Sequence, residues 1–321
     1  MAYTIAETEV DNIKAVHLKK DGQVVMEILP DHGAMLNKLF FPVGDGWLEA
    51  IDGYEQYADV AGQAFMKSAV LFPFPNRLEK GTYRYEGVEY KFPVEENFQG
   101  NAIHGFVRGE SFKVEEMEAR EDGGHAKLAY YYSGDRNYYP FAFGLTILFN
   151  YSEDQLDVRF DVENRGNGHM PIGIGWHPYL TINRQPVDEF ELKLPFVSQV
   201  ELNDENLPTG KVTDFMDYEE PNLVGSREFD DCYKLIMQDH SVLYSPADEV
   251  GLAVEASPEC LFLQVFIPPS RTSIAIEPMN CNVNAFNNQE GLMDLERGSF
   301  YHISCAIRVV SKEEFDELKE E

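Results

Sequence analysis

Two segments of this 321-residue chain carry the alternating pattern of β-hairpins, and this pattern constrains the fold more than any other feature. Residues 83–92 alternate apolar and charged side chains on both sides of Glu86-Gly87, a pair typical of tight turns. Residues 145–151 and 156–162 read as a second hairpin around a polar turn at 152–155. Antiparallel sheet is therefore the expected basis of the fold.

The rest of the chain agrees with an all-β fold. Further strands are expected at residues 24–29, 127–132, 261–267, 272–276 and 301–309. Helix is expected only at the end, where Ser311 and Glu314 form a capping box, and in one short piece around 54–58. Residues 202–224 resemble a long excursion, not a domain boundary. We expect residues 1–321 to form a single domain, a large antiparallel β-sandwich with a short C-terminal helix.

Composition narrows the classes of partner. The chain has 22 Phe and 17 Tyr, which favour sheet, and 26 basic against 56 acidic residues give a formal charge of −30. Such a field repels nucleic acid and anionic membranes, and a neutral substrate is compatible with it. Four dispersed cysteines without a CxxC pair indicate reduced, packed thiols. With no signal-peptide pattern and no long apolar run, a soluble cytoplasmic protein is expected.

Glu277 is a candidate for the floor of a cleft. In an extended segment Ser273, Ala275 and Glu277 share one face, while Ile274 and Ile276 take the other. The isoleucines then supply core, and the small residues leave room in front of the carboxylate. The alternative is an exposed glutamate at a strand end.

His177 is placed by the same argument. Gly175, His177 and Tyr179 fall on one face of an extended run, and Trp176 falls on the other. Pro178 holds His177 in extended geometry and removes one donor of the sheet, which suits a strand edge at a cleft. An imidazole exchanges protons near neutral pH, although a lone histidine beside a tryptophan more often serves packing.

Two further segments carry polar groups suited to a ligand. His104 precedes Gly105 in a turn between expected strands, and glycine permits close approach of the backbone to a ligand. Arg77 follows Asn76 after the stiff apolar residues 72–75. Its fork of donors suits vicinal hydroxyls. The alternative for Arg77 is a structural ion pair with Glu79.

Five segments, taken in their order along the chain, resemble the motifs of the aldose 1-epimerase (galactose mutarotase) family. They are residues 76–81, 103–106, 175–179, 229–233 and 274–278. The resemblance runs from about residue 71 to 308. It implies a β-supersandwich with a sugar cleft across one sheet. It also implies an isomerase that interconverts the α and β anomers of a free hexose by general acid/base ring opening.

The resemblance also implies roles. Glu277 is the base that takes the anomeric proton, and His177 is the acid that protonates the ring oxygen. His104 helps to hold the sugar and takes part in the polar interactions around that oxygen. The residues expected to bind the sugar are Asn76, Arg77, Asp230 and Gln264.

Three points in this pattern call for a choice. The family spacing selects Asp230, three residues before Tyr233, with Asp231 as the fallback. Gln264 lies in an apolar strand, where a satisfied polar group on a half-exposed face is the competing interpretation. His177 is followed by Pro178-Tyr179-Leu180, where better-known members have an aromatic pair and Asn, and this departure bears on substrate preference more than on chemistry.

Other functions stay open. A hexose-6-phosphate 1-epimerase needs cations around the cleft, and four lie close to cleft motifs in sequence: Arg77, Lys80, Arg84 and Arg108. Two histidines and a glutamate also form the ligand set of non-haem iron sites, although here they are spread along the chain. Asp230 and Glu277 are a conceivable glycosidase pair, and a non-catalytic carbohydrate-binding protein needs only aromatics and hydrogen bonders. No cofactor or catalytic metal is expected; a structural calcium ion, the sugar and the oligomeric state stay open.

Overall fold

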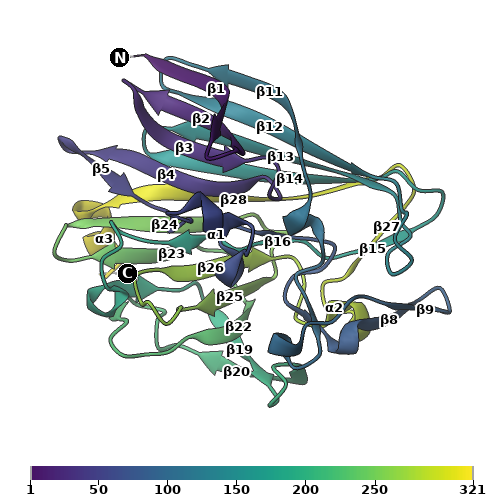
Figure 1. The fold of residues 1–321 in the computed structure, drawn as a ribbon. Coiled ribbons are helices and arrows are strands. Elements are labelled where there is room, and N and C mark those ends of the chain that lie inside the picture. Colours follow the sequence, from purple (N-terminus) through teal and green to yellow (C-terminus); the bar gives the residue numbers. More distant parts are fainter. Residues whose placement is uncertain (1, 320–321) are drawn as a thin grey trace.

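The computed structural model describes residues 2–319 and consists mainly of β-strands in two large antiparallel sheets, with a smaller sheet at the N-terminal end (Figure 1). This confirms the all-β sandwich expected from the sequence. The hairpin at 145–162 is present and slightly longer than predicted, because β13 and β14 are ten residues long each and their pairing extends from Phe143 opposite Asn164 to Tyr151 opposite Leu156.

The larger sheet has nine strands. In spatial order they are β11 (Lys113–Ala119), β12 (Gly123–Tyr132), β13 (Phe143–Ser152), β14 (Gln155–Asn164), β28 (Phe300–Ser311), β24 (Val250–Ala256), β23 (Ser241–Ser245), β18 (Glu191–Lys193) and β21 (Asn222–Leu223). Along β14 every second residue is fully buried, from Leu156 to Val162, while Asp157 and Arg159 between them are exposed. One face of this sheet therefore faces the core and the other faces solvent.

The second sheet has eight strands and carries the pocket described below. Its members are β20 (Pro208–Phe215), β19 (Val197–Leu202), β22 (Asp230–Leu235), β25 (Phe262–Phe266), β26 (Ile274–Met279), β16 (Gly175–Trp176) and β6 (Val70–Leu71), with β17 (Tyr179–Leu180) also paired to β26. Val265, Ile274 and Ile276 are fully buried in one cluster with Phe160 and Leu252 of the nine-stranded sheet. The main hydrophobic core thus lies between the two sheets.

A five-stranded meander precedes them. Its strands are β1 (Tyr3–Val10), β2 (Ile13–Lys20), β3 (Gln23–Leu29), β4 (Met35–Val43) and β5 (Gly46–Glu49). It packs with β1 near β11, and its side chains Val16, Met26 and Phe41 join the main core cluster. The meander therefore extends the sandwich and is not a separate unit packed against it.

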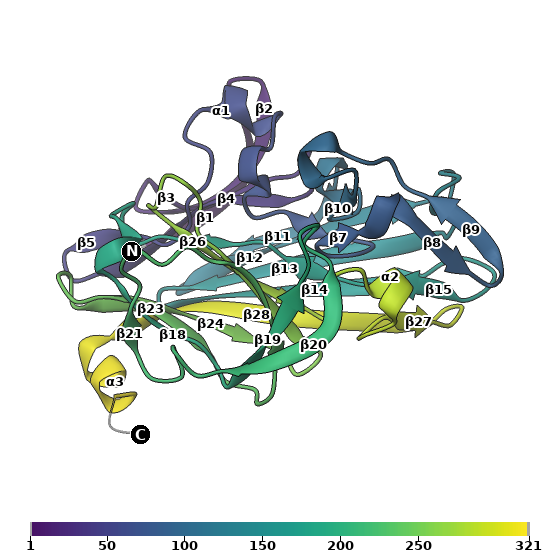
Figure 2. The same cartoon turned by 90° about the horizontal axis from the view of Figure 1, so that it is seen from below.

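Short pairs and helices complete the fold. The pairs are β7 (Arg77–Leu78) with β10 (Ala102–Ile103), β8 (Thr82–Tyr85) with β9 (Val88–Lys91), and β15 (Met170–Ile172) with β27 (Met293–Leu295); the helices are α1 (Tyr57–Val60), α2 (Ala285–Asn288) and α3 (Lys312–Glu317). The β8–β9 hairpin projects from one end and α3 lies at the other (Figures 1 and 2).

The small elements test the local predictions. The β8–β9 hairpin turns at Glu86-Gly87, both with positive φ, as expected. Ser311 caps α3 by accepting a hydrogen bond from the backbone N–H of Glu314. Two predictions were wrong in detail: the helix expected at 54–58 begins only at Tyr57, and the 202–224 excursion contains the edge strand β20. β20 is exposed along most of its length, so it carries little hydrophobic periodicity.

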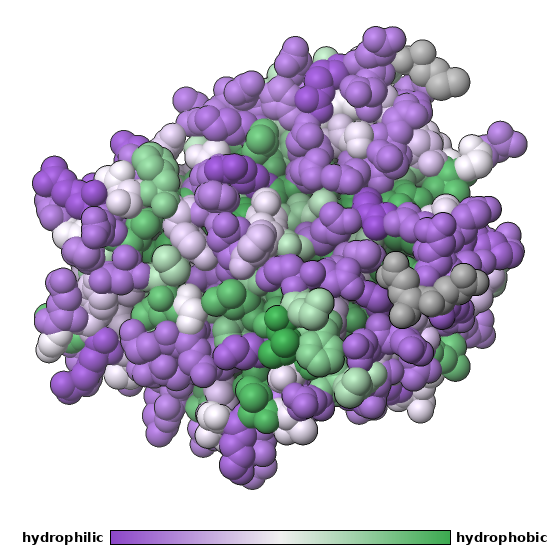
Figure 3. Space-filling view, turned by 180° about the vertical axis from the view of Figure 1, so that it is seen from behind, coloured by the Kyte–Doolittle hydropathy of each residue, from purple (hydrophilic) through white to green (hydrophobic). Residues whose placement is uncertain are grey.

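The surface is predominantly hydrophilic on the face seen from behind, with small separate apolar patches (Figure 3). Cys232, Cys260, Cys281 and Cys305 are all buried and free, as expected of packed thiols. Within residues 2–319, no helix is long and apolar enough to cross a membrane.

Candidate active site

One face of the eight-stranded sheet presents a row of polar side chains. Residues paired directly across antiparallel strands point to the same face, as do alternate residues along a strand. The register pairs Gln264 with Glu277 and Phe266 with Ala275. Asp230 is paired with Phe266 on the other side. These side chains therefore share the face turned away from the main core, which is the alternation predicted for Glu277.

His177 reaches this face from a break between two short strands. β16 ends at Trp176 and β17 begins at Tyr179, with Pro178 between them. The backbone N–H of His177 donates to the carbonyl of Ala69, and its carbonyl accepts from Ser68. The His177 ring stacks on Tyr179 at a centroid distance of 4.9 Å, while Trp176 is buried in the core. The run from β16 to β17 is thus interrupted at His177, the residue whose imidazole lines the pocket.

His104 follows β10, which pairs with β7. His104 has φ 56° and Gly105 has φ 64°, so the chain turns sharply there. A side chain at position 105 would place its Cβ 2.0 Å from the carbonyl oxygen of Phe72. The glycine is therefore required for close contact with the Phe72 backbone, and its service to the approach of a ligand stays a prediction.

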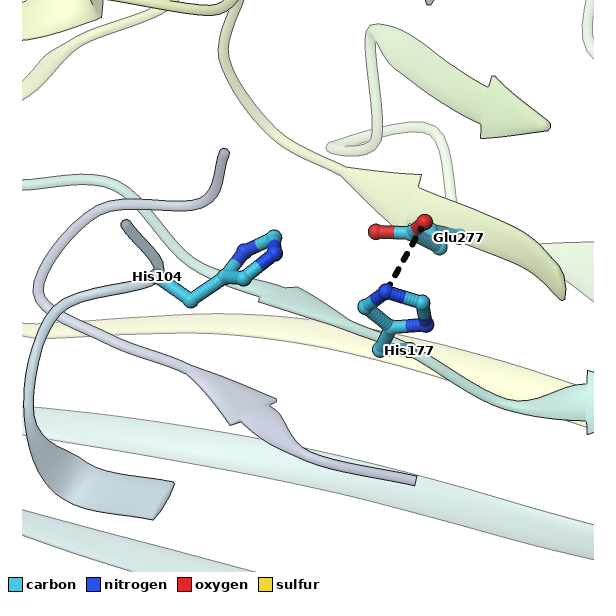
Figure 4. A group of neighbouring side chains, drawn as sticks. All are labelled: His104, His177 and Glu277. Carbon is cyan, nitrogen blue, oxygen red and sulfur yellow. Dashed lines mark ion pairs between the residues drawn. The ribbon is translucent and has the colours of Figure 1, made fainter. Parts of the chain in front are cut away.

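These elements bring His104, His177 and Glu277 together (Figure 4). One ring nitrogen or carboxylate oxygen of each lies within 4.8 Å of the others. His177 Nε2 is 3.2 Å from Glu277 Oε1. Both histidines are 6% exposed and Glu277 is 1% exposed. Glu277 Oε2, a buried atom, has no hydrogen-bond partner among residues 2–319.

Burial controls the protonation of the three groups. It raises the pKa of Glu277 well above the ordinary carboxyl range, and the negative charge of Asp230 adds to the rise. Burial lowers the pKa of His177 to about 3. Burial also holds the pKa of His104 well below its ordinary value, helped by repulsion from His177, Arg108 and Arg77. The pocket therefore favours neutral imidazoles and a carboxyl group that retains its proton.

The backbone selects the tautomer of His104. The N–H of Asn76 donates to His104 Nδ1 at 3.0 Å, so Nδ1 is an acceptor. In a neutral imidazole the other nitrogen then carries the hydrogen. His104 consequently has an Nε2–H donor available. His177 differs, because its Nδ1 has no hydrogen-bond partner within the described part of the chain.

A relay of amides joins the sugar-binding candidates. Asn76 Nδ2 donates to Gln264 Oε1 at 3.0 Å, and Gln264 Nε2 donates to Asp230 Oδ1 at 3.0 Å. Arg77 donates from Nη1 to Asn76 Oδ1 at 3.3 Å. The ion pair considered for Arg77 is not formed, because Glu79 pairs with Lys80. This relay fixes which atoms of each amide face the pocket.

The choice between the two aspartates is decided by their partners. Asp230 lines the pocket beside Glu277. Asp231 accepts a hydrogen bond from Gln199 at 2.7 Å and lines a neighbouring polar hollow instead. The spacing rule that selected Asp230 agrees with this placement.

All seven predicted site residues line one pocket of about 320 Å³, which is at the lower end of the range for small-molecule sites. Six further lining residues were not among the predicted site residues, and they are mostly apolar: Phe65, Met66, Phe98, Ile103, Tyr179 and Phe266. Alternation places Tyr179 on the face of His177 without giving it a role in the site, and the same alternation from Gln264 could have identified Phe266. No sequence signal points to Phe65.

The other cations considered for a phosphate lie elsewhere. Arg84 pairs with Glu89 on the exposed β8–β9 hairpin, and Arg108 pairs with Glu95. Lys80 is largely exposed beside Glu79. Arg77 is the one cationic side chain among the described residues that line the pocket.

The same three catalytic candidates can also hold a divalent transition metal, since two imidazoles and a carboxylate suit such ions. The sequence argument that these ligands are too spread along the chain has no force once the fold brings them together. The neutral imidazoles suit such an ion, but burial disfavours the ionised form of Glu277 that a bound ion requires.

Comparison with known proteins decides the family. The model of the aldose 1-epimerase family matches residues 14–308. The chain belongs to this family. The curated protein YihR of Escherichia coli K12, named as uncharacterized, is 32% identical over 236 residues, which cover 71% of this chain and 74% of YihR.

Solved structures agree with this family fold. A galactose mutarotase-like protein from Clostridium acetobutylicum superposes with a TM-score of 0.84 at 18% identity, covering 97% of this chain and 99% of that one. A galactose 1-epimerase from Lactobacillus acidophilus superposes with a TM-score of 0.78 at 13% identity, covering 96% and 98%. At these identities the likeness establishes the fold.

Proposed function

We propose that this protein is an aldose 1-epimerase, a mutarotase that interconverts the α and β anomers of a free, neutral hexose. The observation that carries the proposal is the buried Glu277 Oε2, which has no hydrogen-bond partner among residues 2–319 and lies beside two imidazoles. An unpartnered buried carboxylate oxygen destabilises a fold unless a ligand supplies its partner. A sugar hydroxyl is such a partner.

The proton inventory of the Glu277–His177 pair fits this chemistry. Across the 3.2 Å contact the pair holds one proton, which burial places on the carboxyl group in the empty pocket. The reactive form has the same net charge with the proton on His177. Because the two groups interact strongly, they titrate as a unit. Sugar hydroxyls around the pair favour the reactive form by supplying hydrogen bonds to both charges.

The reaction then proceeds without net proton exchange. Glu277 takes the proton of the anomeric hydroxyl while His177 gives its proton to the ring oxygen, and the C1–O5 bond breaks to leave an open-chain aldehyde. Rotation about C1–C2 presents the other face of the carbonyl. His177 takes its proton back from O5 as the ring closes, and Glu277 returns its proton to O1. His104 Nε2–H and the Asn76–Gln264–Asp230 relay hold the remaining hydroxyls.

Charge supports a neutral substrate. Among the lining side chains Arg77 is offset by Asp230, while Glu277 keeps its proton in the empty pocket, and the chain has a formal charge of −30. A dianionic sugar 6-phosphate would therefore approach against the overall field without an unpaired cation in the pocket to receive it. Comparing kcat/KM for glucose and glucose 6-phosphate at two salt concentrations tests this. A preference for the phosphate that weakens as salt rises would assign the protein to the hexose-6-phosphate 1-epimerases.

The reaction as proposed asks the protein only to transfer protons while the C1–O5 bond opens and closes, so it needs no metal or other cofactor. Prolonged chelation followed by assay is expected to leave the rate unchanged. Loss of activity that iron or another transition metal restores would favour a metal enzyme built on His104, His177 and Glu277. Loss of thermal stability alone, restored by calcium, would reveal a structural ion.

The direct test is the decay of optical rotation of freshly dissolved α-D-glucose and α-D-galactose, with and without protein. A faster decay to the same equilibrium rotation is expected with at least one sugar. An unchanged rate with both, together with measurable sugar binding, would assign the protein to non-catalytic carbohydrate binding.

A further inference from the structure

Phe65 occupies a place that the fold does not explain. It lies in the segment 63–68, between α1 and β6, and its side chain is 49% exposed. Its ring packs against that of Phe266 at a centroid distance of 6.4 Å and an interplanar angle of 27°. Phe65 lines the catalytic pocket and also a second hollow bounded by Pro268, Pro269 and other residues.

The backbone of this segment is strained. Gln63, Phe65, Met66 and Ser68 have φ angles of 43°, 59°, 51° and 52°, in the left-handed region that residues with a Cβ rarely adopt. Each such residue destabilises the native state unless its surroundings compensate. Strained backbone conformations are frequent at functional sites. In this segment the strained backbone leaves a large apolar ring half-exposed to solvent.

Hydrogen bonds hold the strained backbone in place. The hydroxyl of Tyr179 donates to the carbonyl of Phe65 at 2.9 Å, and the hydroxyl of Tyr54 donates to the carbonyl of Ala64 at 2.7 Å. The side chain of Gln63 donates to the carbonyl of Arg108 at 2.7 Å. Tyr179 also stacks on His177. The segment is thus built onto the same support as the catalytic imidazole.

We propose that Phe65 is a substrate-binding residue whose ring, with Phe266, forms an aromatic platform at the pocket mouth for the apolar C–H face of the sugar. The proposal rests on the proposed function. After ring opening, C1 must rotate while the other carbons stay in place. The polar relay holds hydroxyls but offers no apolar contact, so a flat ring at the mouth supplies the missing restraint. Displacing water from that C–H face also favours binding.

The test is Phe65→Ala, with Phe300→Ala as the matched control, because Phe300 is also an exposed phenylalanine, at 67%, and is not among the pocket-lining residues. We expect KM for the preferred aldose to rise roughly tenfold, as for loss of about 55 Å² of buried apolar contact. We expect kcat to change less than about twofold. Phe65→Tyr should restore the parent KM, and Phe300→Ala should match the parent.

Calorimetric binding of D-glucose and D-galactose separates this proposal from the proposed function. If the parent binds a sugar but does not accelerate mutarotation, the proposed function fails, and weaker binding by Phe65→Ala still supports the platform. Unchanged KM and unchanged binding in Phe65→Ala would overturn the platform. A kcat loss with unchanged KM would also overturn it, since that result assigns the segment to support of His177.

Discussion

Two buried pairs of histidine and glutamate in this molecule have opposite characters. His17 and Glu27 lie side by side in the N-terminal meander with Nε2 and Oε2 2.5 Å apart. His177 and Glu277 lie at the pocket with 3.2 Å between them. Glu27 and Glu277 are 0% and 1% exposed, so burial alone does not distinguish them.

The difference is in the partners of the carboxylate. Glu27 Oε1 accepts from Asn37, and Oε2 accepts from Tyr57 and Lys38 in addition to its contact with His17. Burial opposes ionisation of Glu27, but the hydrogen bonds from His17, Asn37 and Tyr57 outweigh it and lower its pKa to about 2. Glu277 lacks such donors, and its pKa moves in the opposite direction. A fully partnered carboxylate stabilises the fold, whereas a half-partnered one is available for chemistry.

The largest expected effect is on catalysis, in Glu277→Gln. Removing the base should lower kcat about 10²- to 10⁴-fold. The variant should remain folded and at least as stable as the parent, because Gln does not have to bind a proton on folding, as Glu277 with its raised pKa does at neutral pH. Polarimetry measures the loss of kcat, and thermal unfolding measures the stability of the variant. Near-normal mutarotation on every aldose that the parent accepts would show that Glu277 is not the base.

Glu27→Gln should show the reverse. We expect the free energy of unfolding to fall by about 3 kcal/mol, because His17, Lys38 and Tyr57 lose the charge that holds them together. The kcat of the folded fraction should match the parent. Urea unfolding with the assay under native conditions checks both. A stability equal to that of the parent would remove the distinction between the two pairs.

The two pocket histidines should separate in kinetics. His177→Asn removes the proton donor and should lower kcat about 10²-fold with little change in KM. His104→Asn removes a binding contact and should raise KM as well. Steady-state kinetics on both variants decide the matter. If both variants showed equal defects confined to KM, His177 would not be the acid.

The smallest expected effect is on how the free energy of unfolding depends on pH. The pKa of Glu27 is lower in the folded state, so its contribution is complete above pH 4.5 and is lost as pH falls toward about 2. The pKa of Glu277 is higher in the folded state, so its contribution is complete below pH 4.5 and is lost as pH rises through the raised value. Urea midpoints measured across pH should lose acid sensitivity in Glu27→Gln and keep it in Glu277→Gln.

Much of the fold follows from local pattern. The β8–β9 and β13–β14 hairpins, the capped α3 and the two faces of β26 all arise from alternation or turn chemistry within a few residues. The edge strand β20 and the start of α1 were mispredicted because exposed or very short elements carry weak periodicity. Tertiary contacts decide such segments more than propensity does.

The sequence by itself determined the sandwich, the family and the residue types that converge on the pocket, because side-chain alternation and motif order are local properties. Only the tertiary structure decided which of two buried glutamates is left with a free oxygen. Glu27 meets His17 and Lys38 through the register of neighbouring strands, whereas Glu277 meets His104 and His177 through strands and turns from distant parts of the chain. It also decided the exposure of Phe65, since long-range hydrogen bonds from Tyr54 and Tyr179 help to hold that segment in a left-handed conformation.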